Sequence, residues 1–261
     1  MFKSLSVFMV AMAVVITSAA SVEIESHDAS SVFVKQIAGC YKRAPAALLT
    51  RTGSPRILVV KDFATLAKLT EDLVLPIDYF ITNPFPDGNH QVRGFAYGGR
   101  QRAAIFIEHT LGKDHPVYVC DVVLHELAHL YDYPLFNLSM APRQSDSDNF
   151  AKAFKQDIAK IDKKHSEMPH NKHYMSSPRE AFAEAVARTI LLHPDMKGHK
   201  MHVTLFPNVM SYVRKLLIDD GIIRPDHKGD QKLVREVKAV AAKKRARTEQ
   251  SPIGKKRAIH E

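Results

Sequence analysis

The pattern of apolar and polar residues predicts a few short strands and several helices. Branched apolar runs at residues 56–61 and 103–109 are typical of buried strands, and residues 79–81 form a third candidate strand. The segments that read as helices are 62–75, 118–133, 148–161, 178–192, 206–218 and a region that begins at 231. Residues 162–177 are rich in Lys, His and Asn and predict a loop. We therefore expect the α+β fold class, with a small mixed sheet and a mainly helical C-terminal half.

The two ends of the chain differ from the part between them. Lys3, an apolar run at 5–16 and small residues at 17–20 have the composition of a secretory signal peptide. We expect cleavage after Ala20, with an uncleaved anchor as the alternative, and no stable insertion of the mature chain in a membrane. The expected location is extracellular or periplasmic. The predicted divisions are a signal peptide at 1–20, one domain at 21–230, in which 21–100 is a candidate N-terminal subdomain, and a basic, helical to disordered tail at 231–261.

The formal net charge of +9 is concentrated in the tail. Residues 232–261 hold ten Lys or Arg and three Glu, which is +7, so the rest of the chain carries only +2. The basic clusters at 243–247 and 255–257 resemble a two-part import signal or a nucleic-acid patch. For an exported chain, a solvated and disordered terminus is the favoured interpretation, so we do not expect nucleic-acid binding.

Residues 125–129 read His-Glu-Leu-Ala-His, within the helix expected at 118–133. Residues four apart lie on one face of a helix, so both imidazoles can bind one metal ion, while Glu126 can reach a bound water without being a ligand. The alternative is an amphipathic helix that carries two histidines by chance, in a chain with 14 of them. The apolar flanks argue against it, because a buried helix rarely carries three ionisable groups without partners.

A catalytic zinc ion usually takes three protein ligands and one water, so a third ligand is needed. A histidine six residues after His129 is excluded, because Leu135 stands there. Glu180 and Glu184 are four apart on the helix expected at 178–192, so one can bind zinc while the other orients a ligand histidine. The alternatives are a solvated acidic face paired with Arg179 and Arg188 and, for the third ligand, the loop histidines His165, His170 and His173.

The two cysteines, Cys40 and Cys120, fit an exported protein either as one disulfide or as two buried thiols. Cys120 lies just before His125, so a bridge would hold the N-terminal segment beside the metal-binding helix. We favour the disulfide.

These motifs resemble the catalytic domain of anthrax-toxin lethal-factor-like zinc peptidases, which are of the gluzincin type. The residues that carry the resemblance are 125–129 followed by Asp132, and 180–185, which read Glu-Ala-Phe-Ala-Glu-Ala. Residues 206–213 also resemble the helix that follows in the family, so the likeness covers about residues 105–217. It implies a zincin-like fold, with the sheet lying over the helix that carries His125, and one Zn²⁺ per chain.

The resemblance also implies roles for single residues. Glu180 completes the zinc site of the two histidines, and Glu184 and Asp132 support the ligands from outside. The family has a tyrosine seven residues before the ligand glutamate, and its hydroxyl supports the oxyanion. Here His173 stands at seven and Tyr174 at six, so the expected donor is Tyr174, after a one-residue contraction of the loop, or else His173.

Together these residues predict a zinc metalloendopeptidase that acts on a protein or peptide substrate, with Glu126 as the general base. The strand at 103–109 is expected at the edge of the sheet, where an extended peptide can add as a further strand. The alternative is a catalytically inactive, zinc-binding toxin-like module that acts through partner binding, with the tail contacting nucleic acid or import factors. We expect a monomer.

Overall fold

The computed structural model describes residues 24–73, 92–97, 102–133, 143–167, 169–192 and 197–232, together with residues 235 and 239. The predicted signal peptide at 1–20, the candidate strand at 79–81 and most of the basic tail lie outside the described residues.

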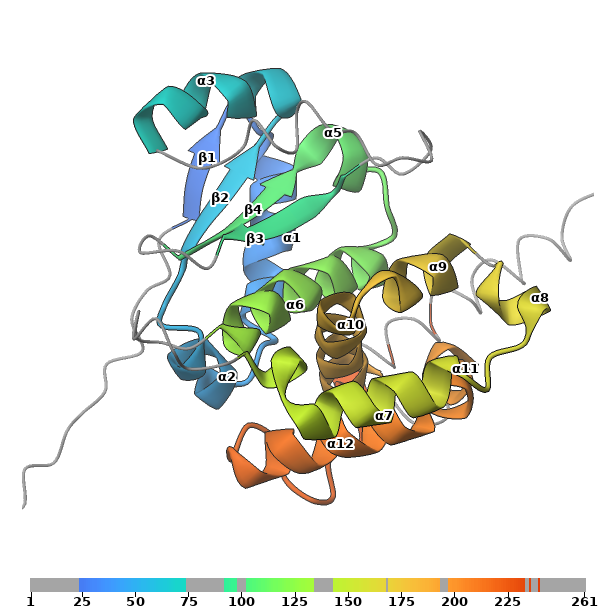
Figure 1. The fold of residues 1–261 in the computed structure, drawn as a ribbon. Helices are drawn as coiled ribbons and strands as arrows, with labels where there is room; N and C mark the ends of the chain where they lie inside the picture. The colour runs from blue at the N-terminus through green and yellow to red at the C-terminus, as the bar shows by residue number, and fades with distance from the viewer. Residues whose placement is uncertain are drawn as a thin grey trace, which may run out of the picture.

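Four strands form one mixed sheet in the order β1-β2-β4-β3 (Figure 1). Strands β1 (Ile24–His27), β2 (Arg56–Val60) and β4 (Ala103–Ile107) are parallel, and β3 (Gly94–Tyr97) runs antiparallel to β4. The prediction that the strand beginning at residue 103 lies at the edge is wrong, because β3 takes that place. All five residues of β4 are buried, as expected of a strand whose two faces are both covered, and β4 pairs with β2 on one side and β3 on the other.

The strand β4 also ends earlier than predicted. Glu108 begins the short helix α5 (Glu108–Leu111) instead of extending the strand to residue 109. The Glu108 carboxylate accepts hydrogen bonds from the backbone N–H and the hydroxyl of Ser30, the residue that caps α1 (Ser31–Tyr41). The end of the strand thus coincides with a contact between segments 78 residues apart.

The sheet separates two hydrophobic clusters. Alternate side chains of β2 and β4, including Ile57 and Phe106, belong to the larger cluster with α1 and with α6 (Pro116–Asp132). The other side chains, including Leu58 and Ile105, pack with α3 (Phe63–Leu73) on the opposite face. Figure 1 shows α3 above the sheet, α6 below it and α1 behind the strands. The predicted arrangement of a small mixed sheet over the His-Glu-Leu-Ala-His helix is therefore present.

The predicted helices of the C-terminal half form, with ends that shift by up to three residues. These helices are α7 (Asp148–Ile158), α10 (Pro178–Leu191) and α12 (Pro207–Asp219). The structure adds elements that were not predicted: α2 (Ala46–Arg51) in the N-terminal half, and α11 (Lys197–Leu205) and the 3₁₀ turn η1 (Gln144–Asp146) in the C-terminal half.

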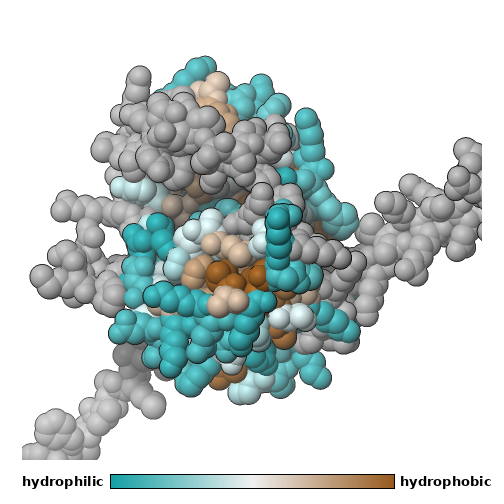
Figure 2. Space-filling model, turned by 45° about the vertical axis from the view of Figure 1, so that its right-hand side comes forward, coloured by the Kyte–Doolittle hydropathy of each residue, from teal (hydrophilic) through white to brown (hydrophobic). Residues whose placement is uncertain are grey.

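On the face in Figure 2, one patch of hydrophobic residues borders a hydrophilic surface. No helix within the described ranges is long and apolar enough to cross a membrane.

The predicted loop at 162–177 is wrong, since most of this segment is helical. It forms α8 (Lys163–Ser166) and α9 (Pro169–Ser176). The Asp162 side chain caps α8 by accepting from the backbone N–H of His165, and α9 packs against α10. Polar helices of this kind lack an apolar stripe, so their stability comes from caps and tertiary contacts that a sequence pattern does not show.

A disulfide joins Cys40 of α1 to Cys120 of α6, as favoured from the sequence. The two cysteines are 80 residues apart, and both side chains are buried in the larger cluster. The bond therefore ties the N-terminal helix to the helix that carries the two motif histidines.

Replacing both cysteines with Ala is expected to lower the free energy of unfolding by about 4–5 kcal/mol, because a long covalent loop restricts the unfolded chain. Urea unfolding of the wild type and the double variant measures the change. Reduction should move the wild-type midpoint towards that of the variant and leave the variant where it is. An unchanged midpoint in the variant would contradict a structural role for the bond.

Candidate metal centre

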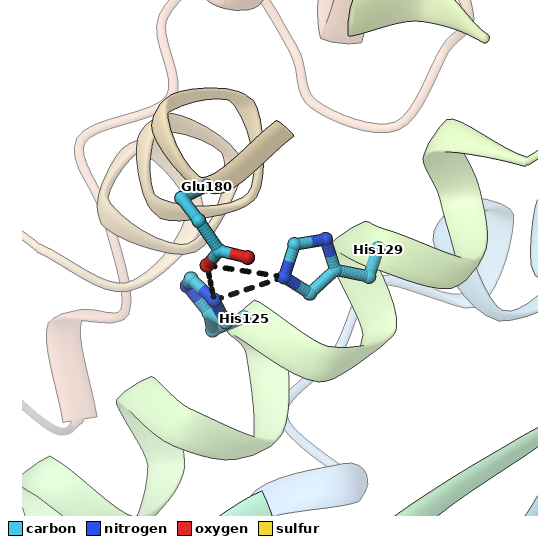
Figure 3. Close-up of side chains that lie close together, drawn as sticks. All are labelled: His125, His129 and Glu180. Atoms are coloured by element: carbon cyan, nitrogen blue, oxygen red, sulfur yellow. Dashed lines mark hydrogen bonds and ion pairs between the residues drawn. The ribbon is translucent and has the colours of Figure 1, made fainter. Parts of the chain in front are cut away.

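Three side chains from two helices point at one another (Figure 3). His125 and His129 stand one turn apart on α6, and Glu180 lies in the first turn of α10. The Nε2 atoms of the histidines are 3.1 Å apart, and the Glu180 Oε2 atom lies 3.1 Å from that of His125 and 3.4 Å from that of His129. Helix α10 begins with Ser177, whose hydroxyl accepts from the Glu180 backbone N–H, and with Pro178, so the local sequence starts the helix where Glu180 can face α6.

This geometry fits a metal ion. Ligands about 2.0–2.1 Å from a tetrahedral ion are roughly 3.3 Å from each other, which matches the three observed separations. These three residues form a cluster with a metal-binding arrangement, and two imidazoles with one carboxylate are a donor set that transition metals such as zinc accept. The third ligand predicted from the sequence, Glu180, is thus brought to the two histidines.

Glu184 lies behind His125 and orients it. Its Oε2 atom is 3.3 Å from the Nδ1 atom of His125, so Nδ1 can donate to the carboxylate and Nε2 is left for the metal. This is the supporting position predicted for Glu184. The acid is 3 % exposed and belongs to the interior, which excludes the alternative of a solvated acidic face.

Arg188 keeps the buried Glu184 in its charged form. Its Nε donates to the Glu184 carboxylate, and its Nη2 lies 2.9 Å from the carboxylate of Asp121, one turn before His125. Burial raises the pKa of Glu184, but the charge of Arg188 and the hydrogen bond with His125 lower it further, to well below its ordinary value. A charged Glu184 is the stronger acceptor for the His125 N–H.

Sequence reasoning weighed Arg188 only as a partner for a solvated acidic face, and it missed Asp121. A usable signal was present, because Asp121 stands four residues before His125 and Arg188 four residues after Glu184. Helical spacing therefore puts each on the inward face of its helix, beside the residue it supports.

Of the two predicted oxyanion donors, His173 lies at the metal centre. Its Nε2 is 3.0 Å from the Oε2 atom of Glu180, and its side chain is 42 % exposed. The Tyr174 side chain is buried, and its hydroxyl accepts from Arg188 at 3.3 Å. The structure thus places Tyr174 beside Arg188, in the buried group behind His125. Because consecutive residues of a helix point about 100° apart, α9 can bring only one of the two to Glu180.

Asp132, predicted to support the metal ligands, contacts the η1 turn. Instead of supporting a ligand histidine, its two oxygens accept from the backbone N–H of Ser145 at 2.7 Å and from the Ser145 hydroxyl at 2.6 Å. The Nδ1 atom of His129 is buried and has no hydrogen-bond partner among the described residues. Asp132 therefore holds the η1 turn against the end of α6.

The side chain of Glu126, a residue of α6, lies close to the edge strand β3. A Cβ atom added at Gly94 of β3 would come within 3.3 Å of the Glu126 Cγ, so the edge strand passes close to this side chain. Within the described part of the chain, no hydrogen bond ties the Glu126 carboxylate to another residue. Burial raises its pKa to about 7, against the lowering effect of His125. A carboxyl group with this pKa can both accept and return a proton near neutral pH.

The other candidate ligand histidines are placed less favourably or not described. His165 pairs with Asp162 at 2.8 Å on the surface. The side chain of His170 lies outside what the structure describes.

Replacing Glu184 with Gln is expected to weaken zinc binding about 10- to 100-fold, because Gln keeps the shape but not the charge that draws the His125 N–H. Competition with a chromophoric chelator measures the dissociation constant. Glu167→Gln, on an exposed side chain, is the matched control and should bind like the wild type. Equal affinity of the Glu184→Gln variant and the control would contradict the role of this contact.

No family model matches the chain, and no curated protein matches it. Among solved structures, the chain is similar to the PRO-PRO endopeptidase (PPEP-2) from Paenibacillus alvei, with 14% sequence identity and a TM-score of 0.47. The likeness covers 74% of this chain and 96% of that one. The resemblance to lethal-factor-like peptidases stays a prediction, and the function is inferred from the geometry of the site.

Proposed function

We propose that the chain is a zinc-dependent endopeptidase of the gluzincin type, similar to the lethal-factor-like peptidases. One observation carries the proposal: the donor atoms of His125, His129 and Glu180 converge at 3.1–3.4 Å, with Glu126 next to the first of them on the same helix. This arrangement combines a metal site and a proton acceptor, which are the two elements of metal-assisted hydrolysis.

The residues divide the chemistry between them. His125, His129 and Glu180 would hold the zinc ion, which would acidify a water molecule and polarise the substrate carbonyl. The Glu126 carboxylate accepts the proton of the attacking water and returns it to the leaving amine. Glu126 stands next to the ligand His125 on the same helix, where its carboxylate can reach a water at the metal.

His173 is the proposed donor to the oxyanion. Its Nε2 lies at the metal centre, and its partly exposed side chain can reach a bound substrate. Tyr174, the other predicted donor, would act in this proposal by holding Arg188, which in turn holds Glu184.

The substrate would bind as an extended peptide along β3. This strand pairs with β4 on one side and lies at the edge of the described sheet, and its Gly94 approaches Glu126. A peptide added as a further strand would pass the general base with its backbone held by hydrogen bonds.

Export is also part of the proposal. The disulfide between Cys40 and Cys120 supports it, because such bonds persist in oxidising compartments. We propose an extracellular or periplasmic monomer whose domain spans 21–230, after a signal peptide at 1–20. The basic tail is proposed as a solvated terminus without a nucleic-acid partner.

The test is whether the zinc-loaded protein hydrolyses a mixture of unstructured peptides and whether the Glu126→Gln variant does not. Cleavage is read by mass spectrometry. Zinc-bound wild type that leaves every peptide of a diverse mixture intact would favour the alternative of a metal-binding module.

A further inference from the structure

Two arginines gather on one tyrosine at the His129 end of the metal site. Tyr133 follows α6 directly and stands four residues after His129. The guanidinium carbons of Arg143 and Arg179 lie 4.5 Å and 5.4 Å from the centre of the Tyr133 ring. Arg179 also donates to the Tyr133 hydroxyl at 2.8 Å. We call Tyr133, Arg143 and Arg179 the arginine site.

Rigid elements hold the arginine site beside the metal centre. Arg179 precedes the metal-binding Glu180 in the first turn of α10. Arg143 precedes the η1 turn, which Asp132 fixes through its two hydrogen bonds with Ser145. Arg179 is therefore placed by the helix that carries Glu180, and Arg143 by a turn that is fixed to the end of the helix that carries the two histidines.

No ion pair with a described residue neutralises the positive charge of this site. Neither Arg143 nor Arg179 forms a salt bridge with a described residue, and the Nε of Arg179 is buried without a hydrogen-bond partner. Burial raises the pKa of Asp132, against the lowering effect of the Ser145 hydrogen bonds and of both arginines, and this acid is 2 % exposed with both oxygens accepting from Ser145. Two like charges close together repel, so the site favours an anion.

The opposite end of α6 shows how such a charge is otherwise balanced. Arg93 lies 5.0 Å from the ring centre of Tyr118, a contact of the same type. Its Nε, however, pairs with Asp114 at 3.0 Å. Only the His129 end therefore offers guanidinium groups without a carboxylate partner among the described residues.

We propose that the arginine site binds a carboxylate of the substrate peptide, close to the bond that is cleaved. The inference rests on the proposed endopeptidase function. A guanidinium group binds a carboxylate through two parallel hydrogen bonds, which makes it selective for this anion on a peptide. Four residues of helix rise about 6 Å from His129 to Tyr133, and an extended peptide advances about 3.3 Å per residue. The carboxylate is thus expected two or three residues from the cleaved bond, as an Asp or Glu side chain or as the peptide's C-terminus.

Cleavage of a proteome-derived peptide library by the zinc-loaded protein tests this inference. The sites cleaved should share an Asp, a Glu or the peptide C-terminus at a fixed distance on one side. Arg143→Gln should lower kcat/KM for an acidic peptide about tenfold and change little for the same peptide with Asn or Gln in place of the acid. Amidation of the C-terminus distinguishes the terminal carboxylate from an acidic side chain.

Arg93→Gln is the matched control, because it removes an arginine that stacks on a tyrosine but is already paired with Asp114. It should leave the preference for acidic peptides unchanged. Arg143→Lys, which keeps the charge and loses the planar fork, should give an intermediate loss and guards against a folding defect in the Gln variant. Cleavage sites without an acidic preference, or an equal loss on charged and amide peptides in Arg143→Gln, would overturn the inference.

A second measurement separates this inference from the proposed function. A pool of random peptides is passed over immobilised, zinc-loaded Glu126→Gln protein, and the retained peptides are sequenced. If no peptide is cleaved by the wild type but acidic ones are retained, and retention is lost in Arg143→Gln, the carboxylate site stands while the peptidase proposal fails. Retention without acidic selectivity would contradict the carboxylate site.

Discussion

Glu180→Ala is expected to lose the tightly held zinc ion. The wild type should bind about one zinc per chain, with His125, His129 and Glu180 as its protein ligands. Outer partners of a metal site change its affinity 10- to 100-fold, so removal of a direct ligand should exceed about 100-fold. Zinc per chain, measured by mass spectrometry of the metal after dialysis against a weak chelator, gives the result without any knowledge of the substrate.

Glu167→Ala, on an exposed side chain, controls for the loss of an acid elsewhere and should keep its zinc. If Glu180→Ala retained zinc as tightly as the wild type, another group would have to be the third ligand. His173 would be the first to test, because its Nε2 lies 3.0 Å from the Glu180 carboxylate. Absence of zinc from the folded wild type would contradict the metal centre itself.

Glu126→Gln is expected to abolish turnover while zinc stays bound. Gln has the size of Glu but cannot take the proton of the attacking water, and loss of a general base costs about 10²–10⁴ in rate. Comparison of kcat on a peptide cleaved by the wild type, beside zinc content, measures both effects. Activity within tenfold of the wild type would exclude Glu126 as the base.

The same variant has a predictable stability, which shows whether a loss of activity reflects unfolding. Burial raises the pKa of Glu126 from 4.5 to about 7 in the metal-free protein. As the pH rises from 4.5 to 7, the unfolded chain ionises this group before the folded chain does, so stability falls over this window and stays lower above it. The neutral Gln avoids this loss. The metal-free variant should therefore melt at a higher temperature than the wild type at pH 8 and match it near pH 4.

The fold shows which elements a local pattern can predict. β2 and β4 are uninterrupted runs of apolar residues, and this pattern alone was sufficient to predict both strands. β1, with partly exposed residues, and the polar helix α9 have no such pattern and were missed. They form because β2 offers a partner for β1 and because α9 packs against α10. Contacts of this kind join distant segments and leave no periodic signal in the sequence.

In the metal centre, too, the sequence pattern predicts some features and the tertiary structure decides the others. The spacing of His125 and His129, and that of Glu180 and Glu184, follows from the helical repeat, which any stretch of helix has regardless of its surroundings. The sequence by itself therefore determined the donor types and their faces, and the resemblance indicated Glu180 as the third ligand. Sequence spacing could not place an atom of residue 180 against one of residue 125, which is a contact across 55 positions.

The tertiary structure alone decided the surroundings of those donors. It brings His173 rather than Tyr174 to Glu180, puts β3 instead of β4 at the edge of the sheet, and turns Asp132 towards Ser145. Each outcome depends on how whole elements pack, and a shift of one residue in a helix turns a side chain by about 100°. The sequence specifies the chemistry of this protein, while the packing of α6 against α10 and β3, and of α9 against α10, decides which groups meet.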